Sequence, residues 1–189
     1  MELTDPQGTP EWRSEAPITD EEWADAQRVV RRAVRTSLHC SIASTNDDGS
    51  AHVTAIGSLQ LTDRGSGYYF DVFNTTLARN VLREPRVTIA AVDSGKLMWL
   101  RSLLRGKFAA SPGLTLVATV GPPRPSTPEE VAGFHRLLGP LLRTRGGRTL
   151  WSRLPQVRDL SVHAIRPIRM GAMTRGGATS SSSPRRDAG

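Results

Sequence analysis

The chain has 189 residues, of which 38% are hydrophobic and 23% charged, and it carries a formal net charge of +7. This composition predicts one globular domain with a substantial core, and no apolar run reaches the roughly 18–20 residues of a membrane-spanning helix. The N-terminus lacks the pattern of a secretory signal, so we expect a cytoplasmic protein without a transmembrane segment.

The net charge and the cysteine and histidine content limit which ligands and metal sites the chain can have. Lys and Arg number 25 against 18 acids, which would suit nucleic acid, an anionic membrane or a phosphate-bearing ligand. Nucleic-acid binders usually combine basic with aromatic residues, and only 5% of this chain is aromatic, so the composition argues against nucleic acid. Cys40 is the sole cysteine, which excludes an internal disulfide, and the four histidines are scattered without ligand spacing. We expect no metal site.

The first predicted elements are an arm and a helix. Residues 1–18 show no periodicity and are predicted to form a flexible arm. Residues 19–22 have the pattern of a capping box, in which the side chains of Thr19 and Glu22 each accept a hydrogen bond from the other's backbone N–H. The helix that follows has an arginine-rich face and an apolar face, so it should pack on the domain of residues 19–173. The apolar face holds Trp23, Ala26, Val30, Ala33 and Val34.

Four strands and a short helix are predicted next. Period-2 alternation and β-branched or aromatic residues favour strands at residues 38–45, 51–60, 68–73 and 86–92. Asp48-Gly49 and residues 63–67 supply the turns of two hairpins. Residues 74–83, between the third and fourth strands, predict a short helix that is capped at Asn74 and stops before Pro85.

A basic amphipathic insertion follows the fourth strand. Residues 96–112 hold four basic residues, no acid and crowded apolar side chains, a pattern that fits a membrane surface, a lid over a pocket or a dimer interface. We favour an interface or a lid.

The remaining elements are two strands and a helix. Residues 113–121 and 160–168 predict a fifth and a sixth strand, and a second capping box at Thr127 and Glu130 starts a helix between them. Residues 144–147 are expected to be a loop, and Trp151 and Leu154 a short packed turn. Residues 174–189, rich in Ser and Arg, are predicted to be a disordered tail.

Three segments, in this order, resemble the FMN-binding split-barrel family whose best-known member is pyridoxamine 5′-phosphate oxidase: "SIASTNDDGSAHVTAIGSL", "YYFDVF" and "NTTLARNVLREPRVTIAAV". The resemblance covers roughly residues 19–120 and, more weakly, the last strand. It implies a mainly β fold with flanking helices, namely a six-stranded antiparallel split β-barrel. It also implies a homodimer with the flavin in a groove between two subunits.

The residues themselves predict an anion site at the start of the short helix. Asn74, Thr75 and Thr76 lie where free N–H groups and the positive end of the helix dipole favour a phosphate, and Arg79 lies one turn further on. The same residues would equally make an ordinary helix cap with Arg79 in solvent. The family commonly has a Ser-Arg-Lys-like triplet here, whereas this chain has Thr75-Thr76-Leu77, so both usual cations are absent and Arg79 would have to compensate.

Other flavin contacts are implied by the resemblance alone. They fall on the second strand, at the end of the third strand and on the fifth strand. The implied residues are His52, Val53, Thr54, Ala55, Asp71, Val72 and Thr115. His52, at a family position often held by a basic residue that faces the phosphate or ribityl chain, could equally be an ordinary surface histidine.

No residue pattern supplies catalysis without a cofactor. The sequence has no Gly-rich nucleotide loop and no paired carboxylates, which points to a function in which a bound cofactor carries the chemistry. We expect an FMN-dependent oxidoreductase that transfers a hydride between the flavin and a small-molecule substrate or nicotinamide. Alternatives are a deazaflavin- or haem-binding split barrel, a degenerate barrel that only binds, and a basic surface binder that acts through residues 96–107 or the Arg tail.

Overall fold

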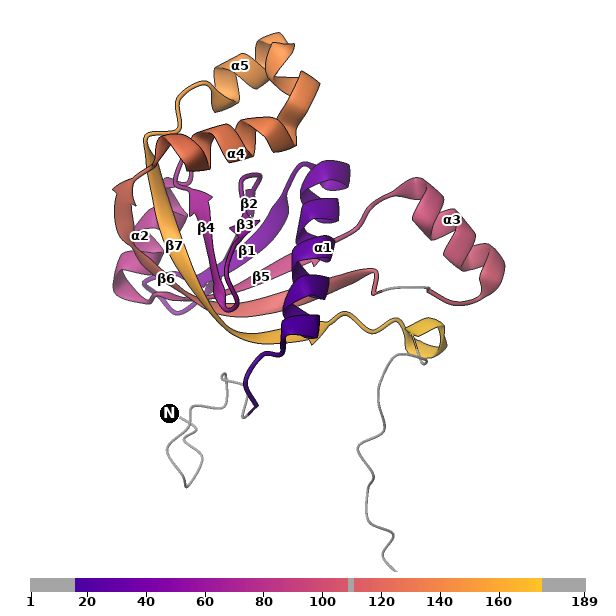
Figure 1. Cartoon of the computed structure of the whole chain (residues 1–189). Coiled ribbons are helices and arrows are strands. Elements are labelled where there is room, and N and C mark those ends of the chain that lie inside the picture. Colours follow the sequence, from indigo (N-terminus) through magenta and orange to yellow (C-terminus); the bar gives the residue numbers. More distant parts are fainter. Residues whose placement is uncertain (1–15, 109–110, 175–189) are drawn as a thin grey trace, which may run out of the picture.

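The structure, a computed structural model, describes residues 16–108 and 111–174 (Figure 1). The predicted arm and tail therefore lie almost entirely outside the described residues, and the limits of 19–173 for the domain stay a prediction. No helix in the described part of the chain is long and apolar enough to cross a membrane.

One antiparallel sheet of seven strands organises the described residues, in the spatial order β2-β1-β5-β6-β7-β4-β3. It bends into an open, barrel-like sheet, with β2 at one edge and β3 at the other (Figure 1). The predicted mainly β, antiparallel architecture is thus confirmed, but the sheet has seven strands in place of six and is open. The strands are β1 (Cys40–Thr45), β2 (Ala51–Ile56), β3 (Gln60–Leu61), β4 (Ser66–Phe70), β5 (Arg86–Val92), β6 (Gly113–Pro125) and β7 (Gln156–Pro167).

The seventh strand arises because the predicted strand 51–60 breaks at Gly57. A Cβ on Gly57 would lie 2.8 Å from the carbonyl oxygen of Leu38, so only glycine permits this close approach. The chain leaves the β2 edge here and pairs again as β3 with β4, at the opposite edge. The hydroxyl of Ser58, between the two strands, accepts a hydrogen bond from the N–H of Phe70 at 3.0 Å.

The helix α1 (Asp20–Ser37) crosses one face of the sheet (Figure 1). The predicted capping box is present, with the N–H of Glu22 donating to Thr19 Oγ1 at 3.2 Å. The predicted apolar face is buried against the inner face of the sheet, in a core that also contains Ile42, Ile89 and Leu116. The expected packing helix is therefore confirmed.

Two helices lie over one end of the sheet: α4 (Pro128–Leu138) and α5 (Arg145–Trp151), joined by the 3₁₀ turn η1 (Gly139–Arg143) (Figure 1). The predicted start of α4 is confirmed, whereas the predicted loop at 144–147 is wrong. Thr144 caps α5 instead, because its hydroxyl accepts a hydrogen bond from the N–H of Gly147 at 3.0 Å. Phe134 of α4 packs on Phe70 of β4 with ring centroids 5.3 Å apart.

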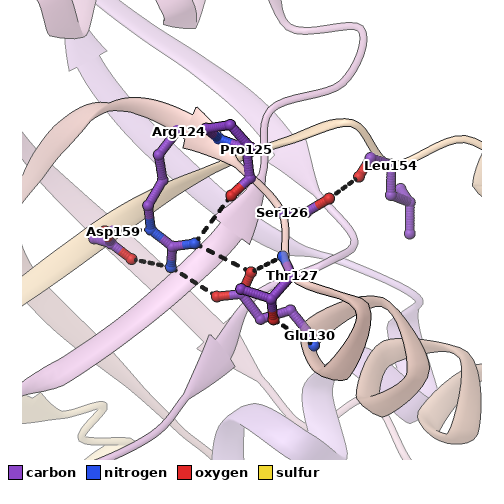
Figure 2. Close-up of polar contacts among 7 residues, drawn as sticks. All are labelled: Arg124, Pro125, Ser126, Thr127, Glu130, Leu154 and Asp159. Atoms are coloured by element: carbon purple, nitrogen blue, oxygen red, sulfur yellow. Dashed lines mark hydrogen bonds and ion pairs between the residues drawn. The ribbon is translucent and has the colours of Figure 1, made fainter.

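A charged cluster fixes the start of α4 to the sheet (Figure 2). The guanidinium of Arg124, at the end of β6, pairs with Glu130 of α4 and with Asp159 of β7, both at 2.6 Å. The hydroxyl of Ser126 donates to the carbonyl of Leu154, which follows α5. This cluster holds the α4–α5 pair in place, and with it the residues that α5 contributes to the site described below.

The remaining helices are α2 (Thr75–Arg83), α3 (Lys96–Arg105) and the 3₁₀ turn η2 (Gly171–Thr174). The prediction of a short helix before Pro85 is confirmed by α2. The basic insertion forms α3, which projects away from the sheet (Figure 1).

Candidate functional site

The end of β2 meets the segment that enters α2. The hydroxyl of Thr54 donates a hydrogen bond to Oδ1 of Asn74 at 3.2 Å, and Nδ2 of Asn74 donates to the carbonyl of Ala55 at 3.4 Å. These contacts join residues about twenty positions apart in the sequence. The structure thus brings together three of the residues that the sequence analysis assigned to cofactor binding.

A cavity of about 140 Å³ opens beside these contacts. It is formed by the end of β2, the segment that follows β4, and the end of α5. Three of the predicted residues, Ala55, Val72 and Asn74, line it, and three of the other lining residues are aromatic, namely Phe70, Phe73 and Trp151.

The start of α2 offers free hydrogen-bond donors next to this cavity. Asn74 occupies the N-cap position but its side chain makes no capping bond, because it is bonded to β2 instead; the predicted side-chain cap is therefore wrong. The first backbone bond of the helix runs from the N–H of Ala78 to the carbonyl of Asn74 at 2.8 Å. Within the described residues, the N–H groups before Ala78 in α2 have no acceptor, which is the arrangement that binds an anion.

Helical periodicity determines which side chains of α2 lie next to the free N–H groups at its start. Thr75, Thr76 and Arg79 fall on one side of α2, because residues three and four apart are neighbours on a helix. Thr75 and Arg79 are exposed and Thr76 is partly exposed, and no described residue pairs with the Arg79 guanidinium. Leu77, by contrast, is fully buried in the main core. A cation at position 77 of this helix would point into the core and could not contact an anion at the helix start. The leucine at this position therefore does not weaken the anion site.

His52 belongs to a partly buried polar network between β1, β2 and α2. Its Nδ1 lies 3.3 Å from Oγ of Ser44, whose oxygen also accepts a hydrogen bond from Nδ2 of Asn80 at 3.1 Å. Asn80 is fully buried and donates to Asn46 at 2.9 Å as well. Its Oδ1 has no partner within the described part of the chain. An unpaired buried oxygen of this kind is costly.

The strand β2 divides the predicted residues between its two faces. His52 and Thr54 lie opposite Ser44 and Ile42 of β1 and therefore face the interior. Val53 and Ala55 point to the outer face of the sheet, where Val53 is 64% exposed. A ligand on the inner face of β2 would therefore meet the side chains of His52 and Thr54. A ligand on the outer face would meet Ala55 or the backbone of β2.

Asp71, which the family resemblance implied as a flavin contact, is held in a buried ion pair. Its carboxylate accepts a hydrogen bond from Nε of Arg158 at 2.6 Å, in an ion pair whose two side chains are 10% and 4% exposed. The backbone N–H of Asp71 is also paired, with the carbonyl of Gln156 at 3.0 Å. The predicted third strand ends at Phe70 rather than Phe73, so Asp71 and Val72 lie in the connection to α2.

Thr115 lies apart from the cavity. It is on β6, where it pairs with Ala90 of β5, which in turn pairs with Ser41 of β1 and thereby with Ala55 of β2. Three strand spacings of about 4.8 Å place it roughly 14 Å from Ala55. Both residues share the outer face of the sheet, so a ligand contact at Thr115 would require a molecule that extends across that face.

The sequence analysis did not assign Phe73, Trp151 or Leu154 to the site. Phe73 has a positive φ of 68° and a 73% exposed side chain, a strained conformation of the kind that clusters at binding sites. The two other residues come from the end of α5 and the turn after it, far away in sequence. No local sequence pattern predicts that Trp151 and Leu154 lie near residue 74. For Phe73, the position of an aromatic residue just before a helix start was a usable signal.

The described residues contain no group of three or more His, Cys, Asp or Glu that could hold a metal ion. Cys40 is buried in the core, and burial raises the pKa of its thiol to about 12. A thiol held in the protonated form is a poor nucleophile. Cys40 is therefore not an activated nucleophile.

Comparison with known proteins bears on the fold. No protein-family model and no curated protein matches this chain. Among solved structures, an FMN-binding protein from Syntrophomonas wolfei subsp. wolfei superposes with a TM-score of 0.54 and 12% sequence identity, over 80% of this chain and 89% of that one. This similarity confirms that the chain has the fold of the FMN-binding split barrels.

Two further solved structures match with lower TM-scores. A candidate pyridoxamine 5′-phosphate oxidase from Lactobacillus delbrueckii matches with a TM-score of 0.45 and 14% identity, over 81% of this chain and 97% of that one. An F420 reductase matches with a TM-score of 0.45 and 15% identity, over 70% and 92% of the two chains.

Proposed function

We propose that this protein binds a phosphate-bearing flavin or deazaflavin and acts as an oxidoreductase on a small molecule, with FMN as the first candidate. The observation that carries the proposal is the uncapped start of α2 beside the aromatic-lined cavity. The donors there are the N–H groups that precede Ala78 and the hydroxyls of Thr75 and Thr76. Arg79 adds the positive charge that a phosphate requires.

The residues present fit the two ends of such a cofactor. The helix start would hold the phosphate, Thr54 and Asn74 would fix the connecting chain, and the aromatic side chains would cover one side of the ring and exclude water. A bound flavin would supply the redox chemistry, since its ring accepts and returns a hydride. The chain's contribution is to bind and orient.

We propose further that the binding unit is a homodimer. The cavity of about 140 Å³ is smaller than the roughly 300–1,000 Å³ of ordinary ligand pockets, so one chain encloses only part of a flavin. The outer face of the sheet beside the cavity carries small or apolar side chains at Ala43, Val53 and Ala55, and these are exposed or partly exposed. A second subunit on this face would close the site and cover these residues.

The test compares FMN with riboflavin, which differ only in the phosphate. If α2 binds the phosphate, the purified chain retains FMN after desalting and binds riboflavin at least about tenfold more weakly. Thr75→Ala/Arg79→Ala should lose FMN affinity by a similar factor while its riboflavin affinity stays unchanged. Arg35→Ala, which removes one exposed arginine of α1, is the matched control and should leave both affinities unchanged.

Two results would overturn the proposal. A chain that retains neither FMN nor a deazaflavin, with an absorbance spectrum free of flavin bands from 300 to 550 nm, would not be a flavoprotein. A chain that binds FMN and riboflavin equally would not use the start of α2 to bind the phosphate, which would remove the observation that carries the proposal. Light scattering of the FMN-loaded chain tests the dimer separately, because a monomeric mass at full FMN occupancy would refute a site shared between subunits.

A further inference from the structure

The outer side of α3 is covered by four leucines that contact little of the protein. Leu97, Leu100, Leu103 and Leu104 are 68%, 54%, 62% and 78% exposed. Their spacing of three, three and one residues places them on one side of the helix. We call this side of α3 the leucine face. Apolar residues gathered on one projecting helix usually mark an interaction site, unlike leucines scattered singly over a surface.

The opposite side of α3 is anchored to the domain, so the orientation of the leucine face is fixed. The indole N–H of Trp99 donates to the carbonyl of Asp93 at 2.7 Å, and its ring packs edge-on against Phe108 with centroids 5.2 Å apart. Ser102 is buried beneath the helix. The N–H of Phe108 donates to the carbonyl of Met173 at 2.9 Å, which ties the end of the insertion to η2.

Positive charge flanks the leucine face. A hollow of about 410 Å³ between α1 and α3 is lined by Arg32, Arg101, Arg105 and Lys107, with Asp93 as the acid among the lining residues. Asp93 is buried, and its Oδ1 already accepts hydrogen bonds from the N–H of Gly95 at 2.9 Å and from the Thr36 hydroxyl at 3.4 Å. No described acid pairs with the four cations, so their charge is available to a partner.

We propose that α3 docks on anionic lipid membranes, with the leucine face in the interfacial region of the bilayer and the flanking cations against acidic headgroups. A short helix with apolar side chains on one side and Lys or Arg beside them binds in this way.

A membrane fits this surface better than a second copy or a nucleic acid does. Two leucine faces brought together would also bring together two sets of unpaired cations, which repel. A single ten-residue helix also presents far less than the about 800 Å² per partner of a stable interface. A nucleic acid would meet the cations but would leave the leucines in water. An anionic bilayer satisfies both the charge and the apolar area.

Co-sedimentation with vesicles tests the proposal on the full chain. Vesicles of phosphatidylglycerol and phosphatidylcholine in equal amounts should bind the chain, and vesicles of phosphatidylcholine alone should bind it at least about tenfold more weakly. Leu100→Glu/Leu104→Glu should lower binding to the acidic vesicles by a similar factor. Leu82→Glu is the matched control, because Leu82 is 69% exposed on α2, and it should bind as the wild type does.

Three outcomes would overturn the inference. They are no binding to acidic vesicles, equal binding by Leu100→Glu/Leu104→Glu and the wild type, and a halved molar mass of that variant in light scattering. The last result would assign the leucine face to a second copy of the chain. All α3 variants should retain FMN as the wild type does, because α3 contributes no residue to the cavity beside α2. A failure here therefore leaves the proposed flavin site untouched.

Discussion

The buried ion pair of Asp71 and Arg158 makes a quantitative prediction about the segment that enters the candidate site. Both side chains are largely out of water, and the guanidinium also donates a hydrogen bond from Nη1 of Arg158 to the carbonyl oxygen of Gly121 at 3.4 Å. Asp71→Asn preserves the shape of the side chain but leaves the arginine charge buried without a counter-charge. Removal of one partner of such a pair typically costs about 3–5 kcal/mol. We expect the Tm to fall by about 6–20 °C.

Urea unfolding and calorimetry of four chains would measure this coupling: the wild type, Asp71→Asn, Arg158→Met and the double variant. The free energy of unfolding of the double variant should exceed that of Asp71→Asn by at least about 2 kcal/mol, because the double variant also removes the Arg158 charge that Asp71→Asn leaves buried without a counter-charge. Asp25→Asn is the control, since the Asp25–Arg28 pair is 40% and 58% exposed and its loss should change stability by less than about 1 kcal/mol. A cost below about 1 kcal/mol for Asp71→Asn would refute the reasoning.

Three further predictions concern single side chains. The hydrogen bonds from Arg124 hold the pKa of Glu130 below its usual value. Glu130→Gln should therefore lower the free energy of unfolding by a constant amount near neutral pH, and the difference should disappear as the pH falls below about 4, because the carboxylate of the wild type is then protonated. Urea unfolding at a series of pH values measures this difference. Cys40 should resist a thiol reagent at pH 8 in the folded chain and react once per chain in denaturant, because burial raises its pKa to about 12; rapid labelling of the folded chain would contradict the packing. Thr76→Arg should raise FMN affinity several-fold, whereas Leu77→Lys should cost at least about 3 kcal/mol of stability with no gain in affinity.

Local signals in the sequence predicted several elements correctly. The capping boxes at Thr19 and Thr127 fixed two helix starts, because each cap depends on residues three apart. The turn at Asp48-Gly49 was predicted correctly for the same reason: Gly49 has a φ of 81°, and the N–H of Ser50 donates to Asp48 at 2.9 Å. Each of these features is decided by neighbours in the chain.

Features decided by contacts between distant residues could not be predicted. The break after β2 depends on how closely Gly57 approaches the carbonyl of Leu38, which alternation of polar and apolar residues does not show. The burial of Leu77 and the role of Arg158 as the partner of Asp71 likewise depend on tertiary packing. The sequence could therefore predict the residues at the start of α2, but not the wall that α5 adds to the site.

The position of the candidate site follows from the opening of the sheet. The chain leaves the sheet after β2, crosses to the opposite edge as β3 and β4, and then returns to enter α2. The outgoing and returning segments meet where Ser58 bonds the N–H of Phe70 at 3.0 Å and where Asn74 bonds the end of β2. In a closed barrel β2 and β3 would pair along their length, and ladder hydrogen bonds would replace these contacts. The open sheet instead leaves a cavity lined from both segments and, because Asn74 is bonded to β2, a helix start whose N–H groups are free for a ligand.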